Sequence, residues 1–128
     1  MKRVLVIEDN RDNLRLIGYA LRRSGYSVES AETGEEGVRK ARECLPSFII
    51  VDINLPDIDG FEVTRRIKEA EATAGIPIVA ITSHAMVGDR ERIIASGCRG
   101  YFEKPLDPLT IVEKIHDLLG ADHEDTDR

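Results

Sequence analysis

The sequence predicts a doubly wound α/β domain, in which helices cover both faces of a parallel sheet. Short apolar runs alternate along the whole chain with amphipathic stretches of helical spacing. Strands that are separated by helices run parallel, through right-handed crossovers. Because no linker, repeat or low-complexity stretch interrupts the alternation, we expect the 128 residues to form one domain.

Five strands are expected, at 4–7, 26–31, 48–51, 78–81 and 100–102. The first and third are continuous apolar runs, which is typical of strands buried on both faces of a sheet. The third is the most apolar run in the chain and ends abruptly at Asp52. The second run is weaker and more polar, so we expect it at an edge of the sheet.

Apolar residues at helical spacing predict five helices, at about 10–24, 34–45, 61–71, 89–97 and 108–120. Either Asp9 or Asn10 can cap the first of these helices. Thr33 and Glu36 form a capping-box pattern for the second helix, which cannot continue through Pro46.

The last helix is expected to be capped by Asp107, with Pro108 in its first position, and to end at Gly120. The structured domain therefore spans 1–120. The stretch at 121–128 is polar and acidic, and we expect it to be a disordered tail.

Composition and charge exclude several classes of protein. The 18 basic and 24 acidic residues give a net charge of −6, which provides no general attraction to nucleic acid. No apolar run approaches the roughly 18 residues of a membrane span. The run at 4–7 stops at Glu8, too early for an export signal. Cys44 and Cys98 lack a second pair for zinc, so we expect free, buried thiols in a cytoplasmic protein.

Polar side chains follow four of the predicted strands. Glu8 and Asp9 follow the first strand, Asp52 the third, Thr82 the fourth, and Lys104 lies just beyond the last. Because ligands of an open parallel sheet bind beyond the carboxyl ends of its strands, we expect these groups to converge. Neighbouring carboxylates repel one another unless a cation intervenes, and Mg²⁺ prefers such oxygen ligands. The sequence therefore predicts a magnesium site at this edge.

The same groups suit phosphoryl chemistry. Asp52, at the tip of the most buried strand, is placed to act as a carboxylate nucleophile toward phosphorus. Mg²⁺ on Glu8 and Asp9 would neutralise the incoming phosphoryl group, and Lys104 would add a second positive charge. The Thr82 hydroxyl can donate a hydrogen bond to a phosphoryl oxygen once one is present.

With these motifs, residues 3–119 resemble the receiver domain of the two-component response-regulator family, the CheY-like superfamily. The matching motifs are Glu8-Asp9, Asp52, Thr82 and Lys104-Pro105, supported by Pro56-Asp57 and Gly60. The resemblance implies a flavodoxin-like (βα)5 fold with strand order 2-1-3-4-5. It also implies a cis bond between Lys104 and Pro105.

The resemblance assigns a role to each residue of the cluster. Asp52 matches the phospho-acceptor, and Lys104 matches the lysine that pairs with the phosphoryl group. Asp9, and Glu8 through a water, match the metal-binding acids. Together with Asp52 and the backbone carbonyl of Asn54, they would form the metal site.

The resemblance also implies a switch. Thr82 matches the hydroxyl that moves toward the phosphoryl group, and Tyr101 matches the aromatic side chain that turns inward as it moves. The surface of the fourth helix, last strand and last helix would then change shape. We expect this surface to include Ile94, Tyr101, Ile111 and Leu118, and helical spacing places Ile111 and Leu118 on a half-exposed flank of the last helix.

The expected function is that of a single-domain response regulator in a phosphorelay. A sensor histidine kinase or histidine phosphotransfer protein would phosphorylate Asp52 with Mg²⁺, and binding to a downstream protein target would change. No direct contact with nucleic acid or membrane is expected, and the chain would be a monomer or a phosphorylation-linked dimer. We expect Asn54 and His84 to tune the lifetime of the aspartyl phosphate.

Two alternatives within the same family stay open at the level of sequence. The chain could be a relay intermediate that passes the phosphoryl group to another histidine protein. It could also be a receiver excised from a hybrid histidine kinase; the Met1 start and short tail argue only mildly against this.

Two enzyme or carrier classes fit the residues less well. Aspartate-nucleophile phosphatases need a second acid two residues after the nucleophile, where this chain has Asn54. A flavin carrier needs a hydroxyl- and glycine-rich phosphate cradle after the first strand, where Glu8 and Asp9 would repel a phosphate. We therefore expect catalysis only of the chain's own phosphorylation and dephosphorylation.

Overall fold

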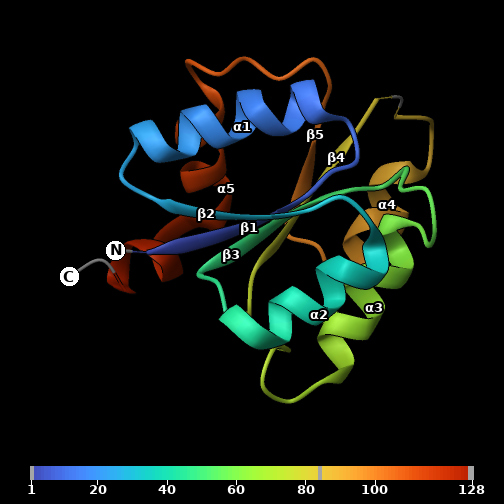
Figure 1. Ribbon diagram of the computed structural model, residues 1–128. Helices are drawn as coiled ribbons and strands as arrows, with labels where there is room; N and C mark the ends of the chain where they lie inside the picture. The colour runs from blue at the N-terminus through green and yellow to red at the C-terminus, as the bar shows by residue number, and fades with distance from the viewer. Residues whose placement is uncertain (1, 84, 127–128) are drawn as a thin grey trace.

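The computed structural model describes residues 2–83 and 85–126, with 121–126 described through their backbone only. Strands and helices alternate throughout this part of the chain (Figure 1). The strands are β1 (Arg3–Ile7), β2 (Ser27–Ala31), β3 (Phe48–Asp52), β4 (Ile78–Thr82) and β5 (Gly100–Glu103). The helices are α1 (Arg11–Arg23), α2 (Gly34–Cys44), α3 (Gly60–Glu69), α4 (Asp89–Ala95) and α5 (Ile111–Thr126).

The sheet is parallel throughout and has the order β2-β1-β3-β4-β5, which confirms the predicted flavodoxin-like topology. Helices α1 and α5 cover one face, and α2, α3 and α4 cover the other (Figure 1). β2 lies at an edge, as its polar sequence predicts, and four of its five residues are only half-buried.

Successive residues of the inner strands point to opposite faces and enter two separate hydrophobic clusters. In β1, Val4 and Val6 pack into the cluster beneath α1 and α5, whereas Leu5 and Ile7 pack into the cluster beneath α2, α3 and α4. Every residue of β3 and β4 is buried. This two-sided burial explains why these strands appear as continuous apolar runs in the sequence.

The helix caps settle one point that the sequence left open and confirm one prediction. Asn10, not Asp9, caps α1, because its side chain accepts a hydrogen bond from the Asn13 backbone at 3.0 Å. At α2, the Thr33 hydroxyl accepts from the Glu36 backbone at 3.1 Å, as the capping box predicts.

The predicted start of the last helix was wrong by one turn. Asp107 accepts a hydrogen bond from the Leu109 backbone at 2.9 Å, but 108–110 form a turn and α5 begins only at Ile111. The prediction that Ile111 is half-exposed was also wrong: it is 3% exposed and part of the core. Ile111 lies one turn before Ile115, which is buried in the same cluster, so the two residues share the core-facing side of α5.

Three further expectations have different outcomes. The bond between Lys104 and Pro105 is cis, as expected. Both cysteines are free, but Cys44 is only half-buried, whereas Cys98 is buried. The last helix was predicted to end at Gly120; the backbone departs from helical geometry there (φ 67°, ψ −154°), but a second helical stretch continues α5 to Thr126. That the tail at 121–128 is disordered stays a prediction.

None of the helices in the described ranges combines the length and apolar character that crossing a membrane requires.

Replacing Phe48 with alanine is expected to lower the free energy of unfolding by about 3–5 kcal/mol, because a large cavity would form in the core. Phe48 is fully buried, and its ring meets the Tyr26 ring edge-on at 5.5 Å. Urea unfolding measures the loss. The control is Leu109→Ala, which removes a side chain that is 78% exposed and should change stability by less than about 0.5 kcal/mol. Equal losses in the two variants would contradict this packing.

Candidate metal and phosphorylation site

Three carboxylates meet at the carboxyl edge of the sheet. Glu8 and Asp9 follow β1 directly, and Asp52 is the last residue of β3. The parallel register pairs Ile7 with Val51, so the ends of the two strands lie level. One carboxylate oxygen from each acid lies within 4.8 Å of those from the other two. The predicted convergence of these acids is confirmed.

Lys104 joins this cluster from the end of β5. Its ammonium nitrogen lies 2.9 Å from Asp52 Oδ2 and 2.8 Å from Glu8 Oε1. Burial alone would lower the pKa of Lys104, but its close contacts with the carboxylates of Glu8 and Asp52 outweigh burial and raise the pKa. The lysine is therefore held charged between two acids.

Glu8 is the most deeply buried acid of the cluster, with no exposed surface. Burial, helped by the hydrogen bond and negative charge of Asp52, raises its pKa to about 7, and the opposing effect of Lys104 is smaller. Although Lys104 lies close to Glu8 Oε1, no hydrogen-bond donor is aligned with this buried oxygen among the described residues. A cation, or a water bound to one, would satisfy it, so the donor set fits a hard divalent metal ion.

Asp52 is 2% exposed and is oriented by the loop that follows it. Its Oδ1 accepts a hydrogen bond from the Asn54 backbone at 3.0 Å. Gly60 closes the loop by donating its N–H to the Ile53 carbonyl at 2.8 Å. A side chain at Gly60 would meet the Asp52 carbonyl at 2.7 Å, so this close approach requires glycine. Asn54 itself is exposed beside Asp52.

The expected switch residues lie on the two neighbouring strands. Thr82 is the last residue of β4 and is 4% exposed, and its carbonyl accepts a hydrogen bond from the Lys104 backbone at 2.8 Å. Tyr101, in β5, is half-buried and packs against the cluster beneath α2, α3 and α4. His84, predicted to tune the phosphate lifetime, lies outside the described residues.

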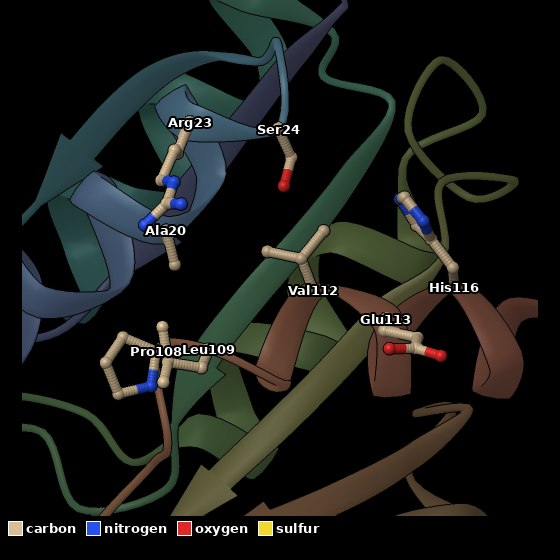
Figure 2. Close-up of a pocket in the computed structure, with 8 residues that line it drawn as sticks. All are labelled: Ala20, Arg23, Ser24, Pro108, Leu109, Val112, Glu113 and His116. Atoms are coloured by element: carbon tan, nitrogen blue, oxygen red, sulfur yellow. The ribbon is translucent and has the colours of Figure 1, made fainter.

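A separate groove of about 340 Å³ lies between α1 and α5 (Figure 2). Its walls include Arg23 and Ser24 from the end of α1 and His116 from α5. The His116 ring has a structural partner, since Nε2 lies 2.5 Å from the Tyr26 hydroxyl. None of the residues that line this groove belongs to the acid cluster.

The fold and the acid cluster define a class of protein, and comparison with known families agrees. Residues 4–116 match the response regulator receiver domain family. Because this match spans most of the 128 residues, the chain belongs to that family. It is a two-component signalling protein rather than a conventional enzyme, and receiver domains interact with histidine kinases.

The chain is similar to single-domain members of this family. It is 40% identical over 119 residues to the polar-differentiation response regulator DivK of Brucella ovis, a match that covers 93% of this chain and 97% of the relative. DivK of Brucella anthropi is 39% identical over the same shares of both chains. The chain thus contains one receiver domain that matches nearly the full length of these relatives.

Solved structures show the same fold. The receiver-domain protein of Methanospirillum hungatei is 28% identical, with a TM-score of 0.87 over 98% of both chains. The receiver domain of the sensor histidine kinase PA1611 of Pseudomonas aeruginosa is 32% identical, with a TM-score of 0.84 over 94% of this chain and 98% of that one. That structure has a magnesium ion coordinated in its active-site cleft.

The raised pKa of Glu8 predicts that metal-free protein loses stability as the pH rises from about 4.5 to about 7. In this range the folded state keeps the Glu8 proton that the unfolded state releases. The free energy of unfolding should therefore fall with rising pH, by up to about 3 kcal/mol. Urea unfolding in a chelator, compared with Glu8→Gln, isolates this effect. The same pH dependence in both proteins would contradict the assignment to Glu8.

Proposed function

We propose that this chain acts as a stand-alone response regulator in the cytoplasm, and that Asp52 is its phospho-acceptor. The observation that carries the proposal is the surroundings of Asp52. This buried carboxylate lies at the end of a central strand, with an ammonium group 2.9 Å away and two further acids beside it. A nucleophilic carboxylate thus lies where positive charge can stabilise a phosphoryl group.

The proposed reaction transfers a phosphoryl group from a phosphohistidine of a kinase or phosphotransfer protein. An Asp52 oxygen attacks phosphorus, so that an O–P bond forms while the N–P bond to histidine breaks. The departing imidazole takes up one proton. Lys104, already bound to Asp52 Oδ2, then pairs with the oxygens of the transferred group.

Glu8, Asp9, Asp52 and the Asn54 carbonyl would hold Mg²⁺ beside the acceptor. When bound, the ion would neutralise charge on the phosphoryl oxygens. Asp9 is exposed, which leaves room for the water ligands that Mg²⁺ usually keeps. Glu8 is buried behind it, with an oxygen that lacks an aligned donor among the described residues.

Phosphorylation would change the protein surface through movements of Thr82 and Tyr101. Thr82 ends the strand next to Asp52 and would turn its hydroxyl toward the phosphoryl oxygens, and Tyr101 would follow it inward. The surface that changes would include Ile94, which is 44% exposed on α4, and the partly buried Leu118 on α5. A downstream protein, or a second copy of the chain, would bind that surface.

Phosphotransfer profiling tests this function. Purified protein is mixed with each phosphorylated histidine kinase and phosphotransfer protein of the source organism, and transfer to Asp52 is timed. Rapid labelling by one kinase, with a phosphate that persists, is the expected result. Onward transfer to another histidine protein would instead favour a relay intermediate. No labelling by any donor would refute the proposal.

A further inference from the structure

The loop between β3 and α3 is fastened to another part of the molecule by one side chain, Asp57. Asp57 Oδ1 accepts a hydrogen bond from the Gly34 backbone at 2.7 Å, and Oδ2 accepts one from Glu35 at 2.9 Å. Both donors belong to the first turn of α2. Asp57 is exposed, and although slight desolvation acts to raise its pKa, hydrogen bonds from these N–H groups outweigh that effect and lower the pKa.

Two side chains from different parts of the sequence accept hydrogen bonds from the backbone N–H groups of the first turn of α2. The Thr33 hydroxyl takes the Glu36 N–H, as an ordinary cap does, while Asp57 takes the Gly34 and Glu35 N–H groups from 23 and 22 residues away. Thr33 therefore acts only within α2. Asp57, by contrast, joins α2 to the loop.

Close packing supports the same junction. A side chain placed at Gly34 would overlap the side chain of Ile58, the loop residue that follows Asp57. Ile58 and Leu55 also pack against the hydrophobic cluster beneath α2, α3 and α4. The middle of the loop is thus held against the start of α2 by both contact and hydrogen bonds.

The two ends of this loop are fixed at the phosphorylation site. The Asn54 N–H donates to Asp52 Oδ1 at 3.0 Å, and the Gly60 N–H donates to the Ile53 carbonyl at 2.8 Å. We infer that Asp57 is a positioning residue, which holds the loop on α2 so that Asn54 stays in place beside Asp52. The inference rests on the proposed function, in which the Asn54 carbonyl is a ligand of Mg²⁺.

Magnesium binding to unphosphorylated protein, measured by titration calorimetry, tests this role. Asp57→Ala is expected to weaken Mg²⁺ affinity by about tenfold, as losses of partners that orient a ligand commonly do. Hydrogen exchange of the Asn54 N–H should also become faster. The matched control is Thr33→Ala, which removes an acceptor from the same turn of α2 but none from the loop. It should change neither quantity.

Asp57→Asn separates positioning from charge, because it removes the negative charge but keeps an oxygen that can accept one of the two hydrogen bonds. It should retain most of the Mg²⁺ affinity, and it serves as the test variant if Asp57→Ala does not fold. Equal losses in Asp57→Asn and Asp57→Ala, with Asn54 exchange unchanged, would assign the effect to charge and overturn the inference. So would equal losses in Thr33→Ala and Asp57→Ala.

A failure of the inference about Asp57 can be distinguished from a failure of the proposed function. If the wild-type protein does not bind Mg²⁺ or does not become phosphorylated, the proposed site is wrong. If the wild type binds Mg²⁺ and Asp57→Ala binds it equally well, only the role of Asp57 is wrong.

Discussion

Asp52→Asn is expected to abolish phosphorylation by acetyl phosphate and by any phosphohistidine donor. The amide that this substitution introduces carries no nucleophilic carboxylate oxygen, so no acyl phosphate can form. The fold should survive, because asparagine has nearly the same shape and keeps an oxygen that can accept one of the two hydrogen bonds that Asn54 and Lys104 now donate to separate oxygens of Asp52. Labelling is measured by intact mass after incubation with acetyl phosphate and Mg²⁺.

The matched control for this substitution is Asp59→Asn. Asp59 is an exposed aspartate of the same loop and caps α3 by accepting from the Glu62 backbone at 2.9 Å, a role that asparagine also fills. This variant should be labelled like the wild type. If Asp52→Asn were still labelled to full stoichiometry, the acceptor would have to be another residue.

Removing Mg²⁺ is expected to slow phosphorylation by about 10²–10³-fold, the scale of losing one main electrostatic stabiliser of a transition state. Without the ion, the negatively charged phosphoryl group would approach three carboxyl groups with only one ammonium group to offset the repulsion. The measurement is the rate of labelling by acetyl phosphate in a chelator, and then after MgCl₂ is restored. Circular dichroism in both conditions establishes that the fold is unchanged.

Two comparisons make the metal result specific. Ca²⁺ should restore less activity than Mg²⁺, because it requires more ligands at longer distances. Asp9→Asn should raise the Mg²⁺ concentration needed for half-maximal rate, whereas Asp12→Asn, which removes an exposed charge from the first turn of α1, should not. Equal rates with and without chelator would eliminate the role proposed for the metal.

The fold and the acid cluster could be predicted from the sequence because both depend on local pattern. Continuous apolar runs place β1 and β3 inside a parallel sheet, and parallel topology brings residues that follow different strands to one edge. Glu8, Asp52 and Lys104 meet for that reason.

Features that depend on contacts between distant segments could not be predicted in this way. Asp57 appears in the sequence as an ordinary turn residue after Pro56, and nothing nearby indicates that it binds α2. Ile111 was predicted to be half-exposed, but it lies one turn before Ile115, and residues of other elements cover this side of α5. The choice of Asn10 over Asp9 as a cap likewise depends on local geometry that both residue types permit.

The contacts of Lys104 connect the acid cluster to the tip of β4. Its side chain holds acids from β1 and β3, while its own N–H is bonded to the carbonyl of Thr82 at the tip of β4. One residue thus connects the ends of four adjacent strands, so we expect a displacement of its ammonium group to shift the backbone at Thr82. A chemical modification that lengthens the Lys104 side chain should therefore disturb the geometry around Thr82 even when no phosphate is present.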